Sequence, residues 1–156
     1  MSWPIRLAQR QREPEIMDDP GLDPARHRAA LRGLARLNRW SASVRIVWTA
    51  VRSLVRAAGR EPLRVLDVAT GGGDVPIGLW KRARHFDVPL EIHACDASPR
   101  ALDYARENAA QAGANVTFFP LDALRAEFPP DYDIVLSSLF LHHLNEPDAV
   151  LLLQKM

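Results

Sequence analysis

The fold is decided by the stretch Val65-Leu66-Asp67-Val68-Ala69-Thr70-Gly71-Gly72-Gly73-Asp74. Its first four residues form a short apolar run around one acid, which is typical of a parallel strand covered on both faces. The three consecutive glycines carry no Cβ, so the backbone can turn sharply and a ligand can lie against the main chain. We therefore predict a strand, a glycine turn and a helix start, an arrangement that builds a nucleotide pocket.

The glycine turn fits the dinucleotide fingerprint G-x-G-x-x-G poorly. When the middle glycine is aligned on Gly71, Ala69 occupies the first glycine position and Asp74 the third. A carboxylate beside a pyrophosphate would repel it, whereas a carboxylate beside a cation would attract it. The loop therefore favours a nucleoside cofactor that carries positive charge.

The spacing Asp67-x-Ala69-x-Gly71-x-Gly73 resembles the first motif of the class I S-adenosylmethionine-dependent methyltransferases. That motif is normally acidic-x-Gly-x-Gly-x-Gly, and Ala69 replaces its first glycine. The resemblance implies S-adenosylmethionine as cofactor, whose sulfonium and ammonium groups suit an acidic loop. The alternative is a glycine turn in an ordinary α/β protein.

The region after residue 60 alternates predicted strands and helices, which indicates an α/β fold with a doubly wound, mainly parallel, Rossmann-like sheet. Ser98-Pro99 is a helix start signal and Gly113 a helix stop signal. The expected strands cover 64–68, 90–95, 116–119 and 132–137, and the expected helices cover 75–84, 99–112 and 147–155, with a short turn at 123–127. The family's sheet has seven strands, so we expect a fold incomplete at the C-terminus, whose fourth strand offers an uncovered edge for self-association.

Residues 1–60 are predicted to form a helical N-terminal cap, separate from a cofactor-binding core at 61–156. Asp23 is the expected N-cap of a helix over 24–39, with Pro24 at its first position and Leu31, Leu34 and Leu37 facing inward. A second helix ends at Gly59. Its apolar stripe consists of Val44, Val47, Trp48, Val51, Leu54, Val55 and Ala58.

The front of the chain is basic and the rest acidic. Residues 1–64 contain 13 Arg or Lys and 6 Asp or Glu, whereas residues 65–156 contain 7 and 13. The arginines indicate either an anionic or membrane-surface partner or, as we favour, an ordinary solvated helix face. The front lacks interleaved aromatic residues and any nucleic-acid fold signature, so no nucleic-acid partner is predicted.

Acids follow the ends of the other predicted strands. Asp96 lies 23 residues after Gly73, close to the spacing of about 20 at which an acid reaches ribose hydroxyls. The resemblance implies that Asp96 chelates both ribose hydroxyls; the alternative is that Asp96 only caps the following helix. The resemblance also implies that Asp122-Ala123 binds adenine, through the Asp122 carboxylate and the backbone N–H of Ala123. Asp67 is expected to accept N–H groups of the glycine loop, and Asp74 either caps a helix or faces the ligand. The predicted cofactor-binding residues are Asp67, Ala69, Thr70, Gly71, Gly72, Gly73, Asp74, Asp96, Ala97, Asp122, Ala123 and Ser138.

The segment 137–144, Ser-Ser-Leu-Phe-Leu-His-His-Leu, carries the candidate catalytic groups His142 and His143. A phenol or enol acceptor must lose a proton during methyl transfer, and a histidine suits that proton. The sequence does not rank the two histidines, and both have a structural alternative as capping or cleft-lining residues.

The acceptor is predicted to be a small molecule. Methyltransferases of exocyclic base amino groups carry Asn/Asp-Pro-Pro-aromatic where this chain has Ser137-Ser138-Leu139-Phe140, and Pro129-Pro130-Asp131-Tyr132 precedes the strand and makes a rigid turn. The resemblance, nearest to the ubiquinone, menaquinone and phenolic-lipid enzymes, implies O- or C-methylation of an aromatic, phenolic or quinone-like compound. The alternatives are a cofactor-binding module or inactive fragment without turnover and, more distantly, an NAD-binding oxidoreductase domain.

Composition adds broad limits. A hydrophobic content of 47% and a charged content of 25% are ordinary for a globular protein. No apolar run is long enough to span a membrane, and the first 15 residues lack the apolar segment of a signal peptide, so we expect a cytoplasmic protein without stable membrane insertion. Cys95 lies in an apolar run and is expected to be a buried, reduced thiol; no metal site is predicted.

Overall fold

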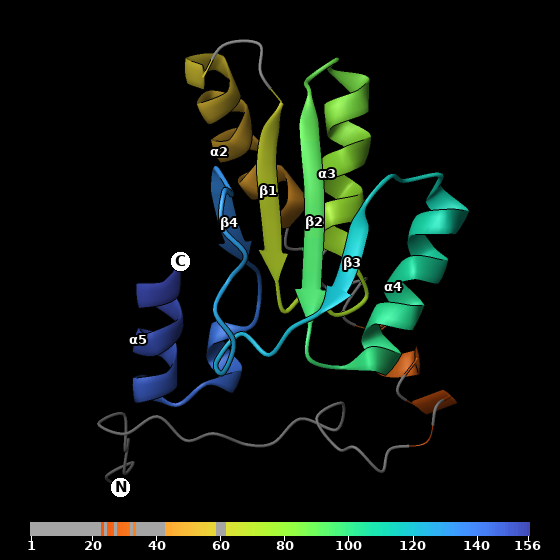
Figure 1. Ribbon diagram of the computed structural model, residues 1–156. Coiled ribbons are helices and arrows are strands. Elements are labelled where there is room, and N and C mark those ends of the chain that lie inside the picture. Colours follow the sequence, from red (N-terminus) through yellow and green to blue (C-terminus); the bar gives the residue numbers. More distant parts are fainter. Residues whose placement is uncertain (1–22, 24, 27, 32, 34–42, 59–61) are drawn as a thin grey trace, which may run out of the picture.

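The computed structural model describes residues 23, 25–26, 28–31, 33, 43–58 and 62–156. In this part of the chain four parallel strands form one sheet in the order β3-β2-β1-β4 (Figure 1). The strands are β1 (Leu63–Val68), β2 (Leu90–Asp96), β3 (Thr117–Pro120) and β4 (Ile134–Ser137). The predicted α/β fold with a parallel sheet is confirmed. Because all strands run in one direction, their carboxyl ends meet at the lower edge of the sheet in Figure 1.

The helices cover both faces of this sheet (Figure 1). They are α2 (Ser43–Ala58), α3 (Asp74–His85), α4 (Pro99–Ala112) and α5 (Glu146–Lys155), with a short 3-10 helix at Leu141–His143. Residues 25–26, 28–31 and 33 are also helical. No helix in the described ranges is long and apolar enough to cross a membrane.

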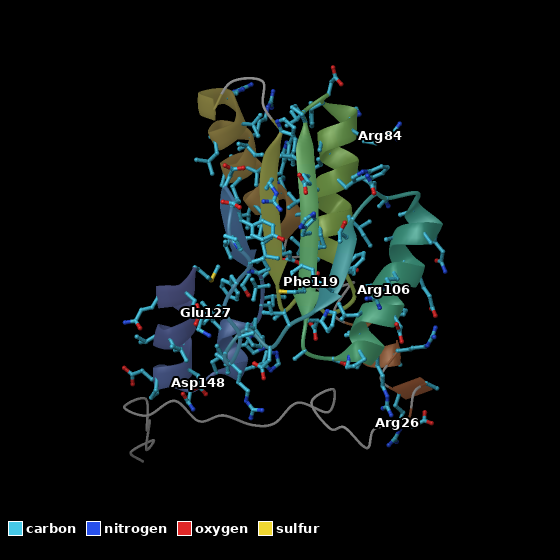
Figure 2. All side chains as sticks on the ribbon, in the orientation of Figure 1. Arg26, Arg84, Arg106, Phe119, Glu127 and Asp148 are labelled. Atoms are coloured by element: carbon cyan, nitrogen blue, oxygen red, sulfur yellow. The ribbon has the colours of Figure 1, made fainter. Side chains whose placement is uncertain are left out.

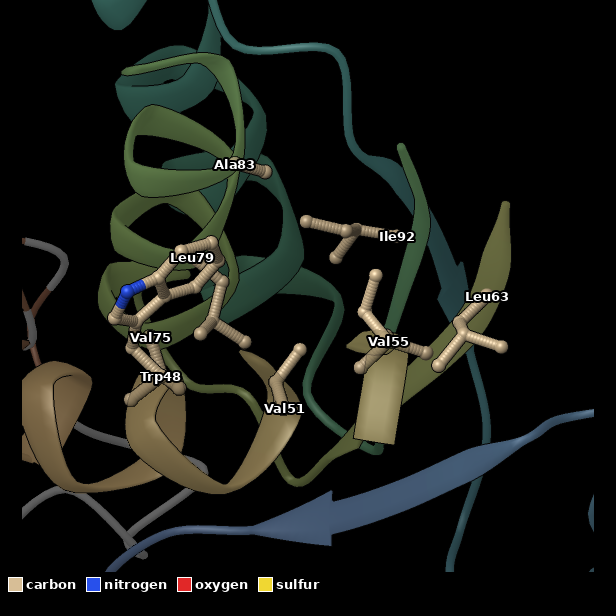
Figure 3. Close-up of a cluster of buried hydrophobic side chains, with 9 residues drawn as sticks. Trp48, Val51, Val55, Leu63, Val75, Leu79, Ala83 and Ile92 are labelled. Atoms are coloured by element: carbon tan, nitrogen blue, oxygen red, sulfur yellow. The ribbon is translucent and has the colours of Figure 1, made fainter. Parts of the chain in front are cut away.

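One hydrophobic cluster joins α2 and α3 to the sheet, and most of its side chains are labelled in Figure 3. It consists of Trp48, Val51, Val55, Leu63, Val65, Val75, Leu79, Ala83 and Ile92. The predicted apolar stripe of α2 is therefore largely confirmed. Leu54, at the margin of the stripe, is 49% exposed, and the side chain of Ala58 is not among those described. The predicted boundary between residues 60 and 61 stays a prediction.

A second cluster lies against Leu66 and Val68 of β1 and includes Leu144 and Leu152, so α5 packs on this side. It also encloses Cys95, which is 0% exposed. Burial raises the pKa of the Cys95 thiol to about 12. The prediction of a buried, reduced thiol is confirmed.

The helix-capping predictions agree with the structure. Asp23 Oδ1 accepts the N–H groups of Ala25 and Arg26 at 3.0 and 3.1 Å. Ser98 Oγ accepts the N–H of Ala101, and Gly113 ends α4 with a φ of 62°. Predictions for Pro24, Leu34, Leu37 and Gly59 lie outside the described residues.

The fourth strand is shorter than predicted, since it begins at Ile134 instead of residue 132. Asp133 donates its N–H to the carbonyl of Arg64 and accepts the N–H of Arg64 with its own carboxylate. Tyr132 turns its hydroxyl to Nδ1 of His93, 2.6 Å away. One backbone and one side-chain hydrogen bond therefore join Asp133 to Arg64 ahead of the strand, and a side-chain contact holds Tyr132.

Candidate functional site

A pocket of about 190 Å³ lies at the carboxyl ends of the strands, where ligands bind in open α/β sheets. Leu31, which is 3% exposed, lies in its wall, as do Leu121 and Leu124. The predicted site residues that line the pocket are Asp67, Ala69, Thr70, Gly71, Asp96, Ala97, Asp122, Ala123, Ser138 and His143. Gly72, Gly73, Asp74 and His142 do not line it.

The glycine loop turns at three positions with positive φ. Ala69, Gly71 and Gly73 have φ values of 56°, 55° and 77°. The N–H of Gly73 closes the turn on the carbonyl of Thr70 at 3.1 Å. Ala69 is therefore a non-glycine residue in the left-handed region, the conformation for which the related motif uses glycine.

Asp67 is buried beneath this loop, with an exposed fraction of 2%. Its Oδ2 accepts the hydroxyl of Thr70 at 2.6 Å. Burial raises the pKa of the Asp67 carboxyl to about 7. The expected role as acceptor of glycine-loop N–H groups is wrong, because the structure gives that role to Asp96.

Asp96 joins the glycine loop to the start of α4. Its Oδ2 accepts the N–H of Gly71 and its Oδ1 accepts the N–H of Ser98, both at 2.8 Å. Each of its two oxygens therefore holds one backbone N–H, and the carboxylate lies in the wall of the pocket. Asp96 thus combines the helix-start contact that was the alternative interpretation with a position in the pocket wall.

The acid after β3 also shapes its own loop. Asp122 Oδ1 accepts the N–H of Leu124 at 3.0 Å, and Asp122 Oδ2 lies 3.6 Å from Nε of Arg125. The Asp122 carbonyl accepts the N–H groups of Arg125 and Ala126. The predicted short turn after the third strand is confirmed.

The two histidines after β4 differ in their position relative to the pocket. Ser137 donates its hydroxyl to the carbonyl of Val68 at 3.0 Å, which ties the strand end to β1. The two imidazole rings lie 4.1 Å apart, centre to centre. His143 lines the pocket together with Phe140, whereas His142 does not line it.

The charges of the pocket match a cationic nucleoside. Asp67, Asp96 and Asp122 line it, and no Lys or Arg is among the described residues that do so. Apolar side chains, among them Leu31, Leu121 and Leu124, supply much of the remaining wall, which suits the flat face of a base. These acidic side chains fit the positively charged S-adenosylmethionine and disfavour a pyrophosphate.

Residues 65–156 match the methyltransferase domain family. The chain belongs to this family. The resemblance to the class I S-adenosylmethionine-dependent methyltransferases is thereby confirmed.

Three curated relatives are similar to parts of this methyltransferase domain. Demethylmenaquinone methyltransferase of Deinococcus radiodurans is 42% identical over 73 residues, covering 47% of this chain and 29% of the relative. Release factor glutamine methyltransferase of the same organism is 42% identical over 79 residues, covering 50% and 26%. Ubiquinone biosynthesis O-methyltransferase of Proteus mirabilis is 29% identical over 97 residues, covering 61% and 37%. The chain thus spans about a third of the length of these relatives.

Solved structures support the fold of the methyltransferase domain. The S-adenosylmethionine-dependent methyltransferase SibL, in its apo form, matches with a TM-score of 0.62 and 26% identity, covering 88% of this chain and 36% of SibL. Magnesium protoporphyrin IX methyltransferase of Synechocystis PCC 6803, with bound SAM, matches with a TM-score of 0.59 and 18% identity, covering 90% and 61%.

Two residues of α4 that support the glycine loop of the methyltransferase domain were missed by the sequence reasoning. Asn108 donates its side-chain N–H to the carbonyl of Gly72 at 2.9 Å. A Cβ on Gly72 would lie 3.3 Å from the ring of Tyr104. Tyr104 and Asn108 are four residues apart and therefore share one helix face, which was the available signal.

The N-terminal helical segment is attached to the same helix. Both terminal nitrogens of Arg28 contact the carboxylate of Glu107, at 2.7 and 3.0 Å, and the guanidinium lies 5.9 Å from the centre of the Tyr104 ring. The contact with Glu107 raises the pKa of Arg28. Leu31 follows Arg28 in this segment and lines the pocket.

Proposed function

We propose that this chain is the cofactor-binding part of an S-adenosylmethionine-dependent methyltransferase whose acceptor is a small aromatic, phenolic or quinone-like molecule. The observation that carries the proposal is the acid-lined pocket, in which Asp96 is fixed between the glycine loop and α4. The demethylmenaquinone and ubiquinone methyltransferases among the relatives support this acceptor class.

The residues of the pocket divide the cofactor among them in this proposal. Asp96 accepts the two ribose hydroxyls, and Asp122 with the N–H of Ala123 reads the adenine edge. The glycine loop lets the main chain approach the amino-acid part of the cofactor, and the Asp96 carboxylate lies against this loop. S-adenosylmethionine supplies an electrophilic methyl group on a positive sulfur, so the protein needs to align the acceptor and remove its proton.

His143 is the proposed proton acceptor, because it lines the pocket and His142 does not. The neighbouring wall is formed by Leu139 and Phe140, which are apolar and suit an aromatic ring. Leu139 has a φ of 57°, a left-handed conformation that directs this segment around the end of β4. An aromatic hydroxyl with a dissociable proton fits this wall better than the side-chain amide of a protein substrate.

A second candidate is binding of the cofactor without turnover, because nearly all of the predicted site residues that line the pocket are cofactor-binding ones. Transfer of a labelled methyl group from S-adenosylmethionine to a demethylated naphthoquinol would separate the two candidates. Label retained on the cofactor, with normal cofactor binding, would favour a binding module.

The outer edge of β4 has no neighbouring strand among the described residues. A strand edge of this kind exposes backbone N–H and C=O groups, and we include self-association through it in the proposal. Sedimentation equilibrium over a wide range of protein concentrations tests this point, and a constant monomer mass would exclude it.

Titration calorimetry with S-adenosylhomocysteine, S-adenosylmethionine and NAD tests the cofactor. We expect binding of the first two and none of NAD, because a pyrophosphate would meet the carboxylates of the pocket. Comparable affinity for NAD, with no binding of S-adenosylhomocysteine, would overturn the proposed function.

A further inference from the structure

Lys155, at the end of α5, holds the loop that carries Asp122. Its Nζ lies 3.0 Å from the carbonyl oxygens of Leu124 and Ala126 and 3.4 Å from that of Ala123. An ammonium group has three N–H donors, so these carbonyls can use all of them. Figure 2 labels Glu127, the residue that follows this turn, near the C-terminal end of α5.

The turn at 122–126 is built like a single turn of helix. At its start, the Asp122 carboxylate accepts the N–H of Leu124, and the Asp122 carbonyl accepts those of Arg125 and Ala126. The carbonyls at the far end of such a turn have no partner within it and carry partial negative charge. A cation is therefore the fitting partner, and α5 supplies it.

The position of α5 is fixed independently of this lysine. Leu152 is 0% exposed and lies in the same cluster as Ala123, which is also buried. The Asn145 side chain caps the start of α5 by accepting the N–H of Asp148 at 2.8 Å. Lys155 thus extends from an anchored helix, so its ammonium can define the shape of the turn.

We infer that Lys155 is a positioning residue for adenine recognition: by binding the carbonyls of the turn, it sets the Asp122 carboxylate and the Ala123 N–H against the pocket. The inference rests on the proposed function, because it assumes that Asp122 and Ala123 meet adenine. Lys155 itself does not line the pocket. Its effect is therefore transmitted through the turn.

The test compares two ligands in the wild-type protein and in Lys155→Met, which keeps the chain length but removes the donors. The ligands are S-adenosylhomocysteine and its analogue in which hydrogen replaces the adenine amino group. The wild type should bind the first at least about tenfold more tightly, the value of one hydrogen bond to a charged acceptor. In Lys155→Met this ratio of dissociation constants should fall to about twofold or less.

Gln154→Met, at the exposed neighbouring position, is the matched control and should keep the wild-type ratio. If Lys155→Met does not fold, Lys155→Gln provides the measurement, and its ratio should lie below that of the wild type. A wild-type ratio in a folded Lys155 variant, even with both affinities reduced together, would overturn the positioning role. A wild-type protein that binds neither ligand would instead contradict the proposed function.

Discussion

Asp96 reaches from the end of β2 to the N–H of Gly71, 2.8 Å away, so one carboxylate both holds the glycine loop and lines the pocket. The loop and the proposed ribose site are therefore coupled through a single side chain. A ligand that binds Asp96 will also stabilise the turn in which Ala69 and Gly71 have positive φ.

Asp96→Ala should weaken the binding of S-adenosylhomocysteine by at least about tenfold, because hydrogen bonds to a charged group contribute about 1.5 to 3 kcal/mol each. Titration calorimetry on the folded variant measures this. Asp103→Ala, which removes an exposed acid paired with Arg106 on α4, is the control and should leave the dissociation constant unchanged. An unchanged constant in Asp96→Ala would restrict Asp96 to its backbone contacts.

Gly73→Ala should destabilise the protein more than Gly113→Ala. Both glycines have positive φ, 77° and 62°, so both substitutions cost about 1 to 2 kcal/mol of backbone strain. At Gly73 the added Cβ would also lie 3.1 Å from Cβ of Ala105 and 3.3 Å from the Phe118 ring, whereas at Gly113 it would have no neighbour within 4 Å. Denaturant unfolding should show a further loss of about 1 kcal/mol or more at Gly73. Equal losses would mean that α4 and β3 yield to the new methyl group.

The buried carboxyl of Asp67 should make stability fall as pH rises. Its pKa is raised from 3.8 to about 7 in the folded protein, so the folded state binds the proton more tightly than the unfolded state between these values. The contribution of Asp67 to the free energy of unfolding is therefore most favourable below pH 4 and is lost as pH rises to about 7.

Asp67→Asn isolates this contribution, because the amide cannot ionise. The difference in unfolding free energy between Asp67→Asn and the wild type should shift in favour of the variant from pH 4 to pH 7 and then level off. Urea unfolding at a series of pH values measures the difference. A difference independent of pH would show that Asp67 does not change its protonation on folding in this range.

His143→Ala should lower methyl transfer to a phenolic or quinol acceptor by about a hundredfold or more, with cofactor affinity nearly intact, if His143 accepts the acceptor's proton. His142→Ala is the control at the adjacent position outside the pocket lining and should retain most of the rate. Single-turnover kinetics with labelled cofactor measure both. Full rates in both folded variants would place the base elsewhere.

The strands, and the acids near their carboxyl ends, could be predicted from the sequence, because apolar runs and glycine turns are local sequence patterns. The 65–68 run lies in β1, and Ser98 and Gly113 bound α4 as expected. The start of β4 could not be read, since Asp133 pairs with Arg64, 69 residues earlier. A contact between residues so far apart in the sequence leaves no local sequence pattern.

The residues of the site could be named more reliably than their partners. Asp67 is the penultimate residue of β1 and Asp96 the last residue of β2, and only the folded geometry shows that Asp96 accepts the N–H of Gly71. Asn108 and Lys155 act through hydrogen bonds to backbone carbonyls. Any donor side chain can make such bonds, so the residue types alone did not predict these contacts. Only the path of the chain after Leu139 distinguishes His143, which lines the pocket, from His142, which does not.

Cys95 is the single cysteine of the sequence, and its side chain is fully buried within the second hydrophobic cluster. A thiol whose pKa is about 12 remains neutral at pH 7, and the neutral form does not react with maleimides. One cysteine introduced at an exposed position, such as Gln154→Cys on α5, would therefore accept a single fluorescent dye in the native protein. The dye would report on movement at the end of α5 with no need to remove the native thiol.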